Sequence, residues 1–342
     1  MQRNPGKWSR STTGVGEPSP ANETVPEQNP MRAPDYWKSH YVTSTDRAEI
    51  DLALKHAHLN TDGESLELIY FPNAPNAPNV LISQGSGGHG YVFAELAYRV
   101  HLWGFNVFVM PKHGGRTVNQ LMSRHLEVLQ YIRREFNDRI GLYGEGLGGY
   151  VAFYVALAHA PIVSLICQNA PAILTEPAYH QALLNDHGLW VRSVRRRRVM
   201  LPLLRPLAAV APRLGVPVSS YLSWKDMIDT RTDSRDLERR LVVDGYLKDP
   251  DFDRWYPLSA VLSLVTTPPP APLEQLTTPT MFVVASKGPT PDYIVDLYQR
   301  LPAISNRLIQ IDGSVYWMLS HQRQATGLIA DWFSATGLTV TT

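Results

Sequence analysis

The sequence is poor in cysteine and has no long hydrophobic run. Its single cysteine, Cys167, excludes an internal disulfide bond and favours a reducing, cytoplasmic setting. No apolar stretch is long enough and free enough of charge to predict a transmembrane helix. Lys and Arg number 32 against 31 Asp and Glu, and the net charge is +1. This balance gives no electrostatic reason to expect nucleic acid or an anionic membrane as a general partner.

Several binding motifs are also absent. The sequence has no spacing typical of metal ligands and no phosphate-binding loop. The glycine-rich segment before Tyr91 does not follow the G-x-G-x-x-G pattern with an acidic partner, so it does not predict a dinucleotide site. We therefore expect no metal ion and no cofactor, and a small organic molecule as the partner.

Residues 1–35 differ in composition from the rest of the chain. They are rich in Pro, Ser, Thr, Asn and Glu, and no apolar run follows their basic residues, so they do not predict a secretory signal. Such a segment cannot bury enough apolar surface to offset the entropy lost on ordering. We expect a disordered leader.

After the leader, short apolar runs alternate with amphipathic segments. This alternation predicts an α/β protein with a mostly parallel, twisted sheet of about eight strands and helices on both faces. The loops that follow the strands meet at one edge of such a sheet, where ligands bind. The predicted strands cover 52–60, 65–71, 79–83, 106–110, 139–143, 163–167, 280–285 and 307–311. The predicted helices cover 91–103, 117–136, 147–159, 291–301 and 322–333.

Residues 174–262 interrupt the alternation. They are helix-prone, rich in Arg and punctuated by Pro. We predict a helical cap here, inserted between the core segments 36–173 and 263–342, where it would cover the ligand-binding edge of the sheet.

Four consecutive arginines lie within this predicted cap. A solvated helix face is the simplest interpretation, and an anionic carrier protein that bears phosphopantetheine, or a membrane surface, is the alternative. The four are Arg195, Arg196, Arg197 and Arg198.

The run R-I-G-L-Y-G-E-G-L-G-G-Y at 139–150 predicts a strand, a tight turn and a helix. It resembles the nucleophile elbow G-x-S-x-G of the α/β-hydrolase superfamily, with Gly146 in place of the serine. The run Q-G-S-G-G at 84–88 is similar to the loop of that family that supplies one backbone N–H to the oxyanion hole. The likeness extends over nearly everything after residue 38 and is strongest to the lysophospholipase and serine-aminopeptidase-like branch. It implies the α/β-hydrolase fold.

The resemblance also identifies the positions of the family's catalytic triad. Gly146 takes the position of the nucleophilic serine, Gly288 that of the acid and Tyr316 that of the histidine. Asp292 and His321 lie a few residues beyond the expected acid and histidine, and are the alternative members of a displaced relay. An engineered change could explain one replacement, but three in separate loops favour a lineage without triad chemistry.

The backbone donors of the elbow do not depend on the triad. The N–H groups of Leu147 and Ser86 can still hold a carbonyl, carboxylate or enolate oxygen, and the phenol of Tyr316 can donate a further hydrogen bond, although it could also be a packed aromatic. Further residues are expected to line the substrate site: Gly85, Gly146, Glu145, His89, His113 and Trp317. Glu145 is either a buried structural hydrogen-bonding group or a proton-transfer group.

These features predict a triad-less enzyme for a small, largely apolar substrate. The expected reaction is a cyclisation, isomerisation or elimination, as in natural-product biosynthesis, because positioning and oxyanion stabilisation remain when the nucleophile is gone. Two alternatives remain open: a ligand-binding pseudohydrolase without turnover, and an ester hydrolase with an atypical relay.

Overall fold

The structure is a computed structural model that describes nine ranges of the chain. These are 36–43, 46–61, 64–170, 173–185, 205–220, 227–229, 232–288, 290–302 and 306–340. The chain divides into two units, Met1–Ala33 and Pro34–Thr342, and all the described ranges belong to the second. The predicted leader and the run of four arginines lie outside the described residues.

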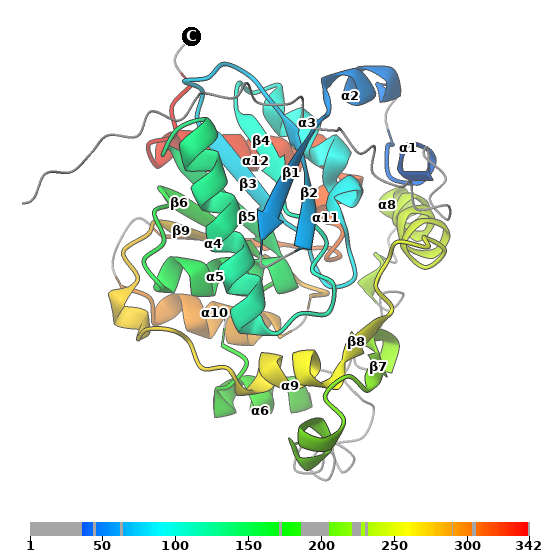
Figure 1. Cartoon of the computed structure of the whole chain (residues 1–342), viewed down its shortest axis with the longest axis vertical. Helices are drawn as coiled ribbons and strands as arrows, with labels where there is room; N and C mark the ends of the chain where they lie inside the picture. Colours follow the sequence, from blue (N-terminus) through cyan, green and yellow to red (C-terminus); the bar gives the residue numbers. More distant parts are fainter. Residues whose placement is uncertain are drawn as a thin grey trace, which may run out of the picture. The chain divides into compact units, whose positions relative to one another are not determined.

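An eight-stranded sheet forms the centre of this unit (Figure 1). Its strand order is β1-β2-β4-β3-β5-β6-β9-β10. β2 is antiparallel to both β1 and β4, and all other neighbours are parallel. The mostly parallel sheet is therefore confirmed. The bounds are β1 Lys55–Thr61, β2 Glu64–Phe71, β3 Asn79–Ser83, β4 Asn106–Val109, β5 Ile140–Glu145, β6 Ser164–Gln168, β9 Thr280–Ala285 and β10 Arg307–Ile311.

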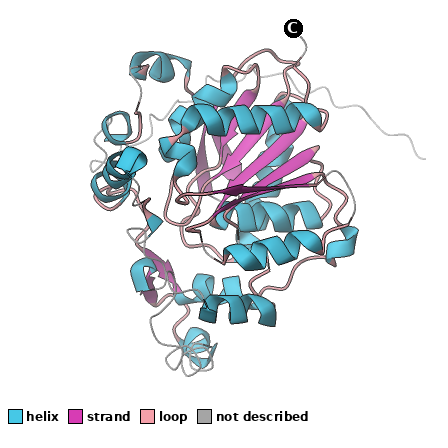
Figure 2. Ribbon diagram, turned by 180° about the vertical axis from the view of Figure 1, so that it is seen from behind, coloured by secondary structure: helices cyan, strands magenta, loops and turns pink. Residues whose placement is uncertain are grey.

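Helices cover both faces of the sheet, as Figure 2 shows. Side chains of α3 and α12 share one hydrophobic core with one face, and side chains of α4, α5 and α10 share a second core with the other. Every residue of β3, β4, β6 and β9 is buried, because strands covered on both faces have no polar side. The bounds are α3 Ala94–His101, α4 Val118–Glu135, α5 Leu147–Leu157, α10 Pro291–Gln299 and α12 Gln322–Ala335.

The interval between β6 and β9 is not wholly helical. It contains a two-stranded antiparallel ribbon, β7 with β8, among its helices. Each ribbon strand has only three residues, too few to give an alternating pattern, and the prediction of a helical cap did not include it. The elements are α6 Pro177–Asn185, β7 Gly215–Pro217, η2 Val218–Ser220, α8 Thr232–Arg239, η4 Arg240–Tyr246, β8 Trp255–Pro257, α9 Leu258–Thr266 and η5 Leu273–Gln275.

Other differences from the predicted elements are at their ends. The predicted first strand begins too early, because Leu52 belongs to α2 (Arg47–Ala53), which follows α1 (Tyr36–His40). The predicted helix at 91–103 divides into η1 (Gly90–Phe93) and α3. A short helix that was not predicted, α11 (Trp317–Ser320), precedes α12.

Candidate active site

Gly146 connects β5 to α5 in a backbone conformation that L residues rarely adopt. Its φ is 52° and its ψ is −118°. Its N–H donates to the carbonyl oxygen of Gln168 at 2.9 Å, and its carbonyl oxygen accepts from the N–H of Tyr150 at 3.0 Å. A Cβ atom placed on Gly146 would have one neighbour within 4 Å, the Cα of Gly85 at 3.5 Å. The turn therefore has the strained conformation of a nucleophile elbow, with an open position where a side chain would begin.

The other glycines of the elbow are required by close packing. A Cβ on Gly148 would lie 2.3 Å from the carbonyl oxygen of Ser83 on β3, and a Cβ on Gly144 would lie 2.5 Å from the Cα of Gly149. Backbone atoms cannot move aside as a flexible side chain can. The sequence G-x-G-x-G-G thus follows from the close approach of β3, β5 and α5.

The glycine-rich loop and the elbow follow neighbouring strands. β3 pairs with β5 in a register that places Ser83 opposite Gly144, and the strand order reverses at this pair. Ligands of open α/β sheets bind at such a reversal, beyond the carboxyl ends of the strands. Gly85 and Ser86 from the loop therefore lie at the same edge as the elbow.

Two backbone donors border this edge. Leu147 is the first residue of α5, and the first N–H groups of a helix have no acceptor within the helix. Within the described ranges, the N–H groups of Leu147 and Ser86 donate to no protein acceptor. Both residues keep partly exposed surface, as do Gly85, Glu145 and Gly146, whereas Gly148 is buried. The two donors are available to an oxygen atom of a ligand.

Tyr316 ends the loop between β10 and α11 and is 5% exposed. Its ring meets the ring of Tyr246 edge-on, with centroids 6.1 Å apart. Burial raises the pKa of Tyr316 well above its ordinary value, and the nearby Tyr246 and Glu145 raise it further. The phenol therefore keeps its proton at neutral pH and can act as a donor. Trp317, its neighbour, is buried in the same core, and its indole N–H has no partner among the described residues.

Gln168 and Asn169, at the end of β6, hold the backbone before Tyr316. The side-chain amides of Gln168 and Asn169 both donate to the carbonyl oxygen of Val315, at 3.4 and 3.3 Å. The Asn169 side chain also accepts from the N–H of Ala285 at 2.9 Å. The pair thus ties the ends of β6, β9 and β10 together. The only signal in the sequence is two amides directly after an apolar run.

Gly288, Asp292 and His321 lie beyond β9 and β10, at the position expected for the acid and at the two alternative positions of a displaced relay. A Cβ on Gly288 would lie 3.1 Å from Oδ1 of Asn169, so an amide borders the position expected for the acid. Asp292 is exposed in the first turn of α10, where its charge suits the helix dipole. His321 is exposed, and its Nδ1 lies 2.9 Å from the hydroxyl of Ser320. Among the described residues, no contact joins Asp292 or His321 to the elbow.

His113 is buried beneath the glycine-rich loop. It is 1% exposed, its Nε2 lies 2.7 Å from the carbonyl oxygen of Gln84, and its ring stacks on His125 with centroids 6.1 Å apart. Burial and His125 lower the pKa of His113 to about 3, although the Gln84 carbonyl opposes them. His113 is thus a neutral ring that supports the backbone of the loop, whereas the sequence suggested a group that lines the site.

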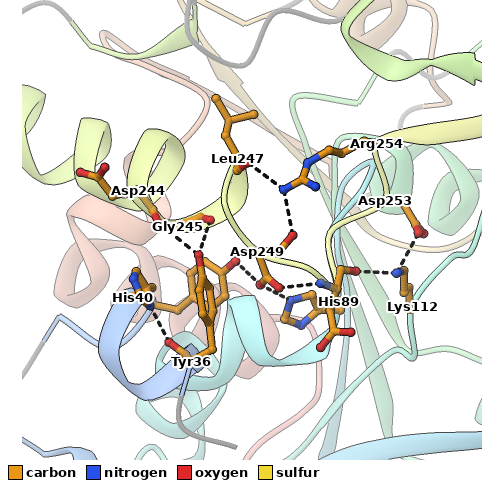
Figure 3. Close-up of polar contacts among 12 residues, drawn as sticks. Tyr36, His40, His89, Lys112, Asp244, Gly245, Leu247, Asp249, Asp253 and Arg254 are labelled. Atoms are coloured by element: carbon orange, nitrogen blue, oxygen red, sulfur yellow. Dashed lines mark hydrogen bonds and ion pairs between the residues drawn. The ribbon is translucent and has the colours of Figure 1, made fainter. Parts of the chain in front are cut away.

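His89 joins the glycine-rich loop to the segment after η4 (Figure 3). Its Nε2 lies 2.8 Å from Oδ2 of Asp249, and the hydroxyl of Tyr41 donates to the same oxygen at 2.5 Å. Burial opposes ionisation of Asp249, but its hydrogen bond and charge interaction with His89 outweigh this and hold its pKa below the ordinary value. His89 was expected to line the site, and in the structure its ring is held by Asp249 from another part of the chain.

The same segment, 249–256, holds the loop at two further points. The N–H of Gly87 donates to the hydroxyl of Tyr256 at 2.8 Å, and the N–H of Asp253 donates to the carbonyl oxygen of Gly87 at 2.9 Å. Lys112 adds an ion pair to Asp253 at 2.8 Å (Figure 3). We call segment 249–256 with these contacts the loop clamp. No sequence pattern predicted these contacts.

Solved structures resemble this arrangement over most of the chain. A lipase in its open form superposes with a TM-score of 0.64 at 15% identity, over 83% of this chain and 99% of that one. The chain has the α/β-hydrolase fold. Two more structures share it: the monoacylglycerol lipase of Paleococcus ferrophilus (TM-score 0.56, 16% identity, 83% and 99% of the two chains) and a soluble variant of the monoglyceride lipase of Saccharomyces cerevisiae (TM-score 0.58, 13% identity, 83% and 96%).

Comparisons of sequence give no information beyond the α/β-hydrolase fold. No model of a protein family matches this chain, and no curated protein matches it either. Within the described ranges, every helix is too short or too polar to traverse a lipid bilayer. The same ranges contain no cluster of three or more His, Cys, Asp and Glu side chains suited to a metal ion.

Proposed function

We propose that this protein binds a small, largely apolar carbonyl compound and converts it without hydrolysis, by a cyclisation, isomerisation or elimination. One observation carries the proposal. The elbow keeps its strained turn, with φ of 52° at Gly146, beside two available N–H donors, but offers no side chain that could attack a carbon. Such a turn suits the stabilisation of an oxygen and not the formation of an acyl-enzyme.

The surroundings of the elbow fit this use. A carbonyl oxygen that accepts from the N–H groups of Leu147 and Ser86 becomes more electrophilic, and charge that develops on it is stabilised by preorganised donors. Tyr316, as a protonated phenol, can supply a further hydrogen bond. Phe252 stacks on Tyr246 with ring centroids 5.3 Å apart, and Tyr246 contacts Tyr316 in turn, so the phenol has aromatic surroundings. Such surroundings would suit an apolar substrate.

The first test separates hydrolysis from other conversions. The purified chain is incubated with a fluorophosphonate and, separately, with a library of apolar esters, lactones and ketones, and intact protein and products are measured by mass spectrometry. We expect no adduct on the protein and products that are isomers of the substrate or have lost a small molecule. A covalent adduct, or products that have all gained the mass of water, would contradict the proposal.

The second test concerns Tyr316. For any substrate found, Tyr316→Phe should lower kcat/KM by about tenfold or more, because one hydrogen bond to developing charge is lost. The matched control is Tyr298→Phe on α10, whose hydroxyl donates to the carbonyl oxygen of Asn306 outside this site. Equal effects of the two substitutions would remove Tyr316 from the reaction.

A further inference from the structure

Glu145 is the last residue of β5 and directly precedes Gly146. Oε2 of its carboxylate would lie 2.2 Å from a Cβ on Gly85, and a Cβ on Gly146 would lie 3.5 Å from the Cα of Gly85. The carboxylate and the open position of the elbow therefore border the same backbone segment. Glu145 also keeps partly exposed surface, as do the three residues Gly85, Ser86 and Leu147 around it.

No cation neutralises this carboxylate within the described ranges. Its side chain forms no ion pair there, and a hydrogen bond from the backbone of Gly85 is the interaction that favours its charged form. Three ionisable groups face it from different elements: Tyr143 on β5, Tyr246 on η4 and Tyr316 before α11. Burial raises the pKa of each of these phenols well above its ordinary value. All three stay neutral when Glu145 ionises.

Burial also affects Glu145 itself. It raises the pKa of the carboxyl group to about 7, although the Gly85 hydrogen bond opposes the shift. A structural carboxylate would gain from a cation or several donors. A group that exchanges its proton near neutral pH is instead suited to act as a general acid and base.

We propose that Glu145 is a catalytic residue that transfers a proton, and that the substrate is a neutral carbonyl compound with an acidic C–H bond next to the carbonyl group. This inference rests on the proposed function and assigns its reaction class. An anionic ligand would be repelled by the ionised Glu145, and a neutral carbonyl oxygen would not. The pair of N–H donors then holds the oxygen on which negative charge develops.

The proposed step balances as follows. The Glu145 carboxylate removes the proton from the carbon next to the carbonyl, the C–H electrons form a C=C bond, and the carbonyl oxygen takes the negative charge. The N–H groups of Leu147 and Ser86 stabilise this enolate. The protonated Glu145 then returns its proton to the far carbon of a C=C bond conjugated with the enolate, which moves the double bond and isomerises the substrate, or to a leaving group that the enolate expels, which completes an elimination.

A probe with one acidic C–H bond tests this role without the natural substrate. The ring of 5-nitrobenzisoxazole opens to a coloured phenolate when a base removes that proton, and the reaction needs no nucleophile. We expect the full-length protein to accelerate the opening, with a rate that rises with pH through about 7. Glu145→Gln should lower the rate at pH 8 by at least about tenfold and abolish the inflection.

Two further variants keep the test decisive. Glu67→Gln neutralises a partly exposed carboxylate on β2 that contacts His56, and should leave the rate unchanged. Glu145→Asp keeps a base on a shorter side chain and should retain part of the rate and a pH inflection, which a merely structural role would not produce. Thermal unfolding by circular dichroism verifies that each variant is folded.

The outcomes separate this inference from the proposed function. If the wild type does not accelerate the probe, or if Glu145→Gln opens it as fast as the wild type, the proton-transfer role is overturned. Non-hydrolytic products from the carbonyl library would then still support the proposed function. If the library yields only products of hydrolysis, the proposed function fails, whatever the probe shows.

Discussion

Gly146 combines two structural features: a positive φ, which favours glycine, and an open space beside its Cα atom. We expect Gly146→Ser to fold and to lower the free energy of unfolding by about 1–3 kcal/mol, because a side chain at a φ of 52° strains the backbone while its Cβ meets nothing closer than 3.5 Å. Unfolding in urea measures the loss.

Gly148→Ser is the control for this substitution. Its Cβ would lie 2.3 Å from a carbonyl oxygen of β3, so the strand and helix must separate, and we expect a larger loss than at Gly146. If Gly146→Ser destabilises the protein as much as Gly148→Ser, the position at the elbow is not open.

At the scale of elements, the loop clamp determines the conformation of the glycine-rich loop. Tyr256→Phe should lower the free energy of unfolding by about 1–3 kcal/mol, because the buried N–H of Gly87 loses its acceptor. The substitution should also weaken the binding of carbonyl ligands, since Ser86 precedes Gly87. Urea unfolding and ligand titration measure the two effects.

Lys112→Met is the matched control for the clamp. It removes the ion pair to Asp253 together with the hydrogen bond that Lys112 donates to the carbonyl oxygen of Asp251. The lysine is 37% exposed, and such partly exposed ion pairs contribute about 0–1 kcal/mol. Should Lys112→Met cost more than Tyr256→Phe, the partly exposed charges and not the buried hydrogen bond would hold the loop.

The elements differ in how well the sequence predicts them. β9 has the predicted bounds, because it is an apolar run between turn residues, and β10 has them too, although it contains Arg307 and Gln310. α4 begins after Thr117, whose capping box with Gln120 supports the predicted start. The β7–β8 ribbon and α11 were missed, since three or four residues show no periodicity. The prediction of the fold was confirmed despite these errors, because the long alternation of strands and helices determines the sheet.

At the scale of the molecule, the site divides into a part that motifs reveal and a part that only folding assembles. Gly85, Ser86 and the elbow lie in local glycine patterns, so the sequence places them. His89 and Asp249 are 160 residues apart, and Gly87 and Tyr256 are 169 apart. No local pattern links such pairs. The predicted roles of Glu145 and Tyr316 depend on similar long-range contacts.

The whole molecule should lose stability in acid through its buried histidines. Burial lowers the pKa of His113 to about 3 and that of His125 to about 4, from an ordinary 6.5. Below pH 6.5 these histidines therefore bind protons in the unfolded chain but not in the folded chain. As a result, the free energy of unfolding falls as the pH falls towards the folded-state pKa values. Glu145, with its raised pKa, acts in the opposite direction between about pH 4.5 and 7.

Urea midpoints at pH 7 and pH 5 measure this acid effect. His113→Asn should reduce the difference between the two midpoints, whereas His58→Asn, on the exposed side of β1, should leave it unchanged. A difference between the two midpoints that His113→Asn does not alter would contradict the neutral, buried state of His113.

The loop clamp has a kinetic consequence. Segment 249–256 holds Gly87 through both its N–H and its carbonyl oxygen, next to Ser86, whose N–H is one of the two donors available to a ligand. An outward movement of segment 249–256 would break both of these hydrogen bonds and release the backbone beside Ser86. If a ligand enters by such a movement, its entry and the alignment of the Ser86 N–H are coupled, because that donor is in position only when the segment has returned.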